Sequence, residues 1–436
     1  MTIGWKKRIF AAAIVMTATV SALWGEAPYQ AAWTTQIGTD TLDQSVAAAA
    51  DTQGNSYVTG YTNGDLGDSN EGYADAFLSK FAPDGSVSWT KLFGTETIDD
   101  GHAVATDLSN NVYVAGNTTG DLGGTNAGNF DTYLRKWDSN GQEVWMTQVG
   151  GAGNDLARSV AVDASGNAYV SGVVTSSSGT TNVISAIVRK FDSNGQELWS
   201  TYAGIPRNDY GEAVALDASG AAYVTGYFHN DSNRYDAYLA KIDSSGNKLW
   251  DRRMGTEEND QSYAVAVDSA GDVYISGTTL GSLGGPSIGY RDAFVVKFDS
   301  DGQEIWRTQL GTPSSDESRA IVIDVSDNIY ISGQTSGDFG GANAGEADAF
   351  IAKLNSDGNT LWVAQVGTSE TDAVWGMAID GFGDPYITGD TRGDFGGPNA
   401  GSADVFLTKF ETPEPATMIM MAAGLPMLLR IRRRRS

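Results

Sequence analysis

Residues 159–172 read SVAVDASGNAYVSG, and residues 186–204 read AIVRKFDSNGQELWSTYAG. These stretches contain four runs of alternating residues: SVAVD (159–163), AYVSG (168–172), AIVRKFD (186–192) and QELWSTYAG (196–204). Alternation rich in β-branched and aromatic residues predicts strands, and the intervening ASGN and SNG segments predict tight turns. The two stretches therefore predict four antiparallel strands in a unit of about 54 residues.

The same unit recurs seven times along the chain. Three residue types follow one irregular series of spacings, which is 56, 56, 54, 51, 56 and 56 residues. They are Trp33, Trp89, Trp145, Trp199, Trp250, Trp306 and Trp362; Tyr57, Tyr113, Tyr169, Tyr223, Tyr274, Tyr330 and Tyr386; and Asp43, Asp99, Asp155, Asp209, Asp260, Asp316 and Asp372. Repeated four-stranded units are typical of a β-propeller, which usually has about four to eight blades.

The phase of the repeat distinguishes a closed ring from an open solenoid. AAWTTQIG (31–38) is a fourth strand without the three that should precede it, and DVFLTKF (404–410) is a third strand without a fourth. Together they complete one blade, whereas a solenoid would leave both strand edges bare. The sequence therefore predicts an all-β, seven-bladed propeller over residues 31–410. The N-terminal strand closes the ring, so that the strand of Trp33 lies beside the strand of Phe406.

The motifs of the repeat are W-x-x-Q-x-G-T, D-x-x-G-N-x-Y-V-x-G and D-A-F-L-x-K-F-D-x-x-G-x-x-x-W. The first copy shows them as Tyr57-Val58-Thr59-Gly60 and in the segment DAFLSKF (75–81), whereas the third copy departs at Ser185. This pattern resembles the SBBP β-propeller repeat of bacterial secreted proteins over about 380 residues. The resemblance implies the fold and says almost nothing about a ligand.

Composition excludes several classes of site. The 436 residues carry a net charge of −26 and contain no cysteine and two histidines, His102 and His229. Disulfides, a thiolate nucleophile and a site with several histidine ligands are therefore excluded. The terminal segments 1–22 and 412–436 contain eight Lys and Arg and one Glu, so the net charge without them is −33. This acidity argues against a nucleic-acid partner.

The N-terminal segment has the pattern of a secretory signal peptide. Residues 1–22 combine a basic start with a short apolar run, and Ala22 is a small residue suited to the cleavage site. A retained membrane anchor is the alternative, although the apolar run is short for a span of about 20 residues. Residues 23–30 are then a short linker.

The C-terminal segment 411–436 differs from the acidic body. It contains Pro413-Glu414-Pro415, the apolar run 416–429 and a basic end formed by Arg430, Arg432, Arg433, Arg434 and Arg435. The run is short for a span, and the arginines favour a cytoplasmic end, which predicts transient membrane anchoring. The arrangement resembles the PEP-CTERM sorting signal. That resemblance implies an exosortase-type transpeptidase as partner in a Gram-negative bacterium, an inner-membrane intermediate and a final place at the cell surface or in an exopolysaccharide or biofilm matrix. A plain C-terminal anchor is the alternative.

The loops divide between two faces because neighbouring strands are antiparallel. The tight turns share one face, while the longer second-to-third strand loops and the blade connections share the other, which we call the long-loop face. The seven repeated aspartates listed above lie on that face before each first strand. As a ring of carboxylates they could hold Ca²⁺, the one cofactor that the sequence leaves open. The favoured interpretation is architectural, with each carboxylate accepting hydrogen bonds from turn N–H groups.

The repeat is least regular in blades three and four. Their second-to-third strand loops are VTSSSGTTNVIS (174–185) and FHNDSNRYD (228–236), and these are expected to leave a gap in the long-loop face. The nearby residues Arg207, Asp209, Tyr210, His229, Arg234 and Tyr235 form a candidate site for a sugar or an anionic ligand.

The sequence predicts a non-catalytic protein that binds carbohydrate or protein. It contains no spacing that pairs a nucleophile with a base. Two alternatives stay open: an enzyme acting on polysaccharide through carboxylates of the long-loop face, and a structural spacer stabilised by Ca²⁺.

Overall fold

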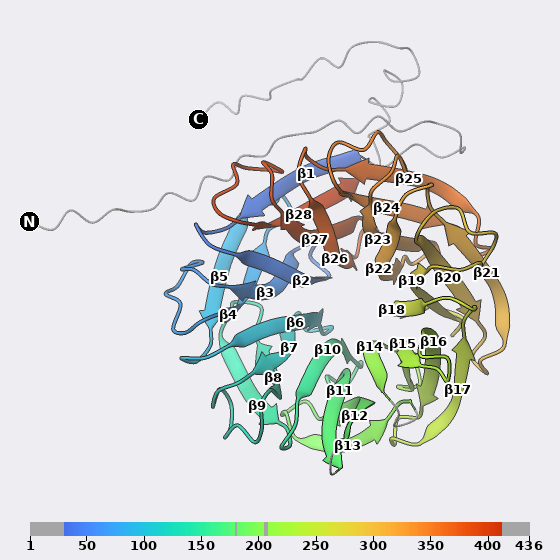
Figure 1. Cartoon of the computed structure of the whole chain (residues 1–436). Coiled ribbons are helices and arrows are strands. Elements are labelled where there is room, and N and C mark those ends of the chain that lie inside the picture. Colours follow the sequence, from blue (N-terminus) through green and yellow to red (C-terminus); the bar gives the residue numbers. More distant parts are fainter. Residues whose placement is uncertain (1–29, 179–180, 205–207, 412–436) are drawn as a thin grey trace, which may run out of the picture.

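The computed structural model describes residues 30–178, 181–204 and 208–411, which form seven four-stranded antiparallel sheets arranged as a ring (Figure 1). The predicted seven-bladed propeller is confirmed. The first strands of blades one to seven are innermost and are β2 (Asp43–Ala50), β6 (Asp99–Thr106), β10 (Asp155–Val162), β14 (Asp209–Leu216), β18 (Asp260–Val267), β22 (Asp316–Ile323) and β26 (Asp372–Ile379). The second strands are β3 (Ser56–Thr62), β7 (Val112–Thr118), β11 (Ala168–Ser178), β15 (Ala222–His229), β19 (Val273–Thr279), β23 (Ile329–Thr335) and β27 (Pro385–Thr391).

The third and fourth strands complete each blade toward the outside. The third strands are β4 (Asp75–Phe81), β8 (Asp131–Trp137), β12 (Thr181–Phe191), β16 (Tyr235–Ile242), β20 (Asp292–Phe298), β24 (Asp348–Leu354) and β28 (Asp404–Glu411). The fourth strands are β5 (Val87–Phe93), β9 (Glu143–Val149), β13 (Glu197–Tyr202), β17 (Lys248–Met254), β21 (Glu304–Leu310), β25 (Thr360–Val366) and, in blade seven, β1 (Gln30–Ile37).

The ring closes as the phase of the repeat predicts. Strand β1 pairs antiparallel with β28, and Trp33 lies opposite Lys409. The sheet of blade seven therefore contains both ends of the described chain, in the order β1-β28-β27-β26. Pairing of the first strand with the last removes both free strand edges of an open array.

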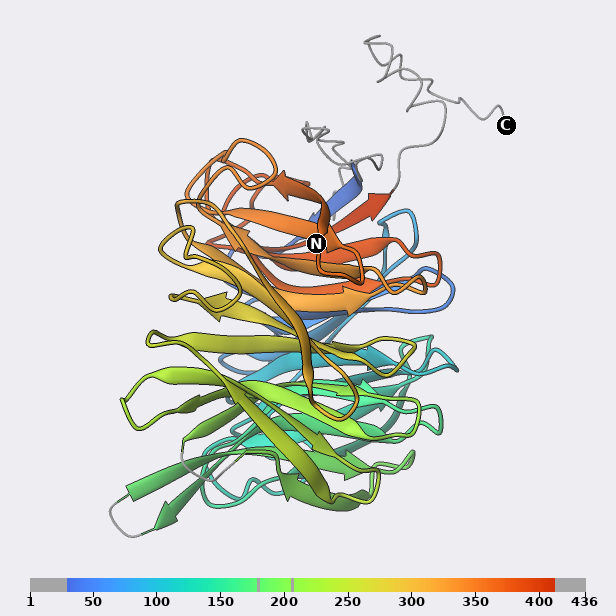
Figure 2. The ribbon, with the colours of Figure 1, turned by 90° about the vertical axis from the view of Figure 1, so that its right-hand side faces the viewer.

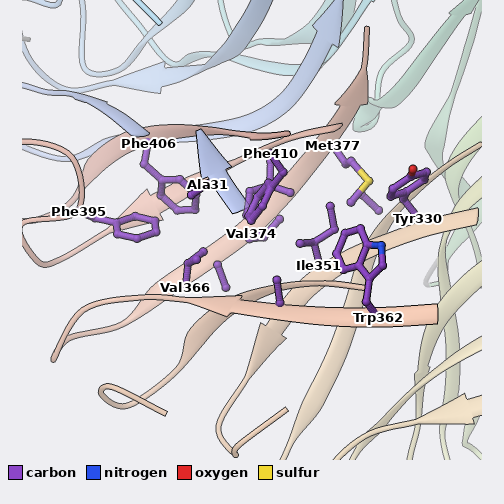
Figure 3. Packing of buried hydrophobic residues seen from close by; sticks show 14 residues of the cluster. Ala31, Tyr330, Ile351, Trp362, Val366, Val374, Met377, Phe395, Phe406 and Phe410 are labelled. Atoms are coloured by element: carbon purple, nitrogen blue, oxygen red, sulfur yellow. The ribbon is translucent and has the colours of Figure 1, made fainter. Parts of the chain in front are cut away.

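The core lies between neighbouring blades. In every blade the repeated Tyr and Trp rings meet edge to face or tilted, with centroids 5.8–6.1 Å apart. Figure 3 shows one such pair, Tyr330 and Trp362, beside Ile351 and Met377 between blades six and seven. The tryptophans are thus core residues of the blade interfaces, as the sequence favours.

Six of the seven repeated tryptophans, all except Trp362, lie against a turn glycine of the next blade. The indole of Trp89 packs on Gly141, whose φ of 78° places it in the left-handed region. A Cβ at that position would lie 3.1 Å from the indole ring. The glycine therefore serves both the turn and the close packing of two blades.

Two sequence predictions differ from the structure. The first strand of blade three was expected at residues 159–163, but β10 spans Asp155–Val162. A β-bulge at Arg158 interrupts the alternation, so the sequence pattern shows only the part of the strand after the bulge. The loops of blades three and four were expected to leave a gap. Instead, β11 and β12 extend to 11 residues each and form a hairpin that projects from the long-loop face (Figure 2).

Candidate functional site

The seven repeated aspartates begin the inner strands and are buried. Asp43, Asp99, Asp155, Asp260, Asp316 and Asp372 accept the backbone N–H of the residue four positions earlier at 2.5–2.8 Å. Asp260 and Asp316 also accept the hydroxyls of Thr279 and Thr335 on the second strand. Burial raises the pKa of Asp260, although these hydrogen bonds oppose the rise. The carboxylates therefore tie each blade connection to its own blade.

The aspartate ring is a poor match for a shared metal site. Over residues 30–178, 181–204 and 208–411 no group of three or more His, Asp or Glu side chains is arranged to hold a metal ion. The Oδ2 atoms of Asp99 and Asp372 accept hydrogen bonds from the preceding turn, whereas their Oδ1 atoms are buried without a hydrogen-bond partner among the described residues.

The structure brings together only part of the cluster predicted in blades three and four. The ring of Tyr235 lies 6.4 Å from the ring of Tyr210 and 4.2 Å from that of His229. Asp209 is buried, and Arg234 pairs with Glu258 at 3.5 Å on the exposed side. Arg207 lies outside the described residues.

A second set of residues, one from each blade, faces the central channel. Every inner strand contains a β-bulge three residues after its aspartate, and the bulged residue is left out of the ladder. We call these residues the bulge ring: Val46, His102, Arg158, Glu212, Tyr263, Arg319 and Trp375. All seven line one cavity of about 980 Å³ at the centre of the propeller.

The walls next to the bulge ring are apolar. The next two residues of each inner strand are small or aliphatic, as in Ala47 and Ala48 or Ala320 and Ile321, and they line the same cavity. The channel therefore combines a ring of chemically different side chains with an apolar throat, which is typical of ligand sites.

Aromatic and arginine side chains form a continuous series on one side of the channel. The guanidinium of Arg319 lies 5.3 Å from the ring of Trp375 and 4.2 Å from that of Tyr263. Tyr263 contacts Tyr227 at 6.1 Å between centroids, and Tyr227 stacks on Tyr210 at 4.8 Å. Tyr235 meets Tyr227 edge to face at 5.1 Å. We call these six residues the aromatic arc, and they come from blades four to seven.

Charged groups hold the arc in place. Arg319 donates to Glu317 at 2.6 Å, and Arg291 pairs with the same carboxylate. Burial alone would raise the pKa of Glu317, but the two arginines outweigh it and hold the pKa below its usual value. At the other end, Nε1 of Trp375 donates to Asp390 at 2.5 Å. The arc is therefore preorganised by partners outside it.

Acidic groups also face the channel. Asp100 and Glu212 line the cavity, and Asp100 lies 3.4 Å from Nε2 of His102. Burial raises the pKa of Asp390, which the hydrogen bonds from Trp375 and Gln44 oppose.

Sequence reasoning found two members of the arc, Tyr210 and Tyr235, and missed the other four. A signal was present, because the position three residues after the repeated aspartate holds six residue types in seven copies. Alignment of the copies within the chain shows this variable position between neighbours that are small in nearly every copy.

Comparison of the sequence with known families also indicates a β-propeller. The chain contains SBBP repeats. The sequence model described as the SBBP beta-propeller repeat matches residues 32–67, 88–123, 144–176, 250–284 and 305–340. The bulges at Val46, His102, Arg158, Tyr263 and Arg319 fall inside these five SBBP repeats.

Two curated relatives are similar to parts of the chain. The regulatory protein FlaEY of Caulobacter vibrioides is 28% identical over 163 residues, which are 34% of this chain and 17% of that protein. An uncharacterized WD repeat-containing protein of Acanthamoeba polyphaga mimivirus is 23% identical over 432 residues, which cover 82% of this chain and 30% of that protein. The chain thus spans less than a third of either relative.

Solved structures are similar in fold. A puromycin hydrolase mutant has a TM-score of 0.50 at 11% identity, with 81% of this chain and 51% of that chain covered. A protein of unknown function from Dyadobacter fermentans has a TM-score of 0.47 at 11% identity and covers 88% of this chain and 99% of that chain.

The predicted processing sites lie outside the described residues: Ala22, Pro413, Glu414, Pro415, Arg430, Arg432, Arg433, Arg434 and Arg435. Within the part of the chain that the structure describes, no helix has the length and apolar character to span a bilayer.

Proposed function

We propose that this protein is an exported, non-catalytic carbohydrate-binding β-propeller whose ligand enters the central channel at the bulge ring. The observation that carries the proposal is the aromatic arc, in which Trp375, Tyr263 and Tyr227 offer ring surface to one cavity. Sugar rings present apolar C–H faces that pack on aromatic rings, while their hydroxyls need hydrogen-bonding partners. The bulge ring supplies both kinds of group in one cavity.

The rigidity of the site favours binding of a small ligand. The bulge residues project from inner strands that are paired on both sides of the bulge, and the arginine and tryptophan of the arc have fixed partners. A preorganised site loses little side-chain entropy when the ligand binds.

Export and sorting form the second half of the proposal. The signal-peptide pattern of residues 1–22 and the Pro-Glu-Pro, apolar and arginine segments of residues 413–435 support it. An exosortase-type enzyme would process the C-terminal segment, and the acidic propeller would reach the surface or the exopolysaccharide matrix of a Gram-negative cell. Mass spectrometry of the surface-associated protein tests this: a mature chain that still contains Arg430 would contradict processing.

A glycan array with the purified chain tests the binding proposal. We expect selective binding without turnover, and Tyr227→Ala is expected to weaken it at least about tenfold through loss of ring contact. Arg252→Gln is the control, because Arg252 lies on an outer strand and donates to backbone carbonyls of the next blade. Equal binding by wild type and Tyr227→Ala would contradict the proposal.

Hydrolysis of a polysaccharide is the second candidate, and the pair of Asp100 and His102 in the channel favours it. An acid and a base near a bound glycosidic bond could act as proton donor and acceptor. Release of shorter sugars from a bound glycan, abolished by Asp100→Asn, would replace the non-catalytic proposal with this one.

A further inference from the structure

The two arginines of the bulge ring have very different surroundings. Arg319 is held by Glu317 and packs on two aromatic rings. Arg158 makes no hydrogen bond or ion pair with any residue in the described ranges. The Nε of both arginines is shielded from solvent without an acceptor, so the two differ in the rest of the guanidinium, which only Arg319 pairs with a carboxylate. A guanidinium N–H that is buried without an acceptor loses its hydration and gains nothing in exchange. Arg158 is therefore a cation without a partner in a ligand-sized cavity.

The residues around Arg158 show which part of the channel it lines. The inner strands of blades three and four, β10 and β14, pack side by side, and Arg158 lines the cavity together with Tyr227 and Glu212. Burial raises the pKa of Tyr227, Glu212 raises it further, and the positive charge of Arg158 lowers it. Both charged groups therefore act on the same tyrosine of the aromatic arc.

We propose that Arg158 binds a carboxylate of the ligand, and that the channel consequently takes an acidic glycan containing uronic acid. This inference rests on the proposed carbohydrate function and specifies its substrate class. The planar guanidinium presents paired N–H donors that match a carboxylate, and the adjacent Tyr227 ring can pack against the sugar that carries it.

Acidic side chains in the same cavity limit the negative charge that a bound ligand can carry. Asp100 and Glu212 line the same cavity, and residues 23–411 have a net charge of −33. A phosphate monoester, which carries a charge of about −1.5 to −2 at pH 7, meets stronger repulsion than a single carboxylate does. The carboxylate of Glu212 lines the same cavity, so it also repels an acidic ligand and lowers its affinity.

Calorimetric titration of the full chain with matched sugars tests the inference. The probes are oligosaccharides of galacturonic, glucuronic and mannuronic acid, each paired with its carboxyl-reduced counterpart. We expect at least one acid form to bind about tenfold to a hundredfold more tightly than its reduced form. Arg158→Gln should remove this difference and leave the reduced form unaffected, whereas Glu212→Gln should tighten binding of the acid form.

Arg307→Gln is the matched control, since Arg307 lies on outer strand β21 and pairs with Glu304. It should keep the full preference for the acid form. Equal binding of acid and reduced forms by wild type, or a preference that survives in Arg158→Gln, overturns the inference while leaving carbohydrate binding intact.

If no oligosaccharide of either form binds, the proposed carbohydrate function fails, and the carboxylate site is then decided by NMR. The Nε–H resonance of Arg158, assigned by its absence in Arg158→Gln, is followed during titration with glucuronate and with glucose. A shift with glucuronate alone supports the site. No shift with glucuronate overturns it.

Discussion

Each blade contains two kinds of repeated position that differ in how far their residue types vary. One kind is the buried Tyr and Asp positions, which we call the frame, and the other is the bulge ring. Positions of the frame, such as Tyr274 and Asp260 in blade five, carry the same residue in all seven copies and are fully buried. Three residues after that aspartate, the bulge ring carries Val, His, Arg, Glu, Tyr, Arg or Trp. Close packing between blades allows only one residue type at each frame position. A bulged residue that faces the channel lies outside the β-ladder, so its residue type can vary. The repeated frame positions therefore form the scaffold, and the variable bulge position of each blade carries the side chains suited to ligand binding.

Two tyrosines of blade five test this difference most strongly. Tyr274 is buried in the frame, where its hydroxyl donates to Asp268 at 2.9 Å and its ring meets Trp306. Tyr274→Ala should cost about 3–5 kcal/mol of the free energy of unfolding because it leaves a cavity between blades. Tyr263→Ala should cost about 1–2 kcal/mol and abolish glycan binding, since its ring faces the channel. Urea unfolding measures both, and equal losses of stability would contradict the division.

The glycines of the outer turns separate backbone strain from blade packing. Gly141→Ala should cost about 1–2 kcal/mol for the left-handed backbone, plus a further loss from overlap with the indole of Trp89. Gly271 is the control, because its φ is 87° and nothing lies within 4 Å of a Cβ built there. Thermal melting should show a larger decrease for Gly141→Ala than for Gly271→Ala. Equal decreases would mean that Trp89 does not dock on this turn.

The aspartates of the frame predict an unusual pH dependence. Burial raises the pKa of Asp372 above its ordinary value of 3.8, and Asp43, Asp99, Asp260 and Asp316 shift in the same direction. The folded chain therefore binds protons that the unfolded chain has released. The stability from these groups is complete below the ordinary pKa and is lost as pH rises through the folded pKa. The melting temperature should therefore gain from these groups as pH falls from neutral toward their ordinary pKa of 3.8.

Asp372→Asn should reduce this increase, because the amide does not titrate. Asp138→Asn is the control, since hydrogen bonds from Gln142 lower the pKa of Asp138 and its contribution has the opposite sign. An Asp372→Asn variant whose melting temperature follows the wild-type pH dependence down to about pH 4 would contradict the raised pKa of Asp372.

Removal of calcium should have the smallest effect. The carboxylates of Asp43 and Asp260 already accept N–H and hydroxyl donors, so they do not need a metal ion as a partner. We expect EDTA to change the melting temperature by less than about 1 °C. A large decrease that added Ca²⁺ reverses would favour the calcium-stabilised spacer instead.

The fold could be predicted because its determinants are repeated. The spacing of Trp, Tyr and Asp defined seven units, and the incomplete first and last units predicted the pairing of β1 with β28. The channel site was largely missed because its residues depend on a register irregularity. Regular alternation would predict that Arg158 and Tyr263 are ordinary strand residues. The β-bulges at these positions instead direct them toward the channel. The extended hairpin of blade three was also missed, since its serines and threonines read as a loop.

The most direct measurement compares a variant with Tyr263, Arg319 and Trp375 all replaced by serine with the wild-type chain. Calorimetric titration with a glycan that binds the wild type is run beside a thermal melt. The predicted result is a folded protein with a single melting transition and no detectable glycan binding. Retention of wild-type affinity in this variant would contradict the assignment of ligand binding to the bulge ring.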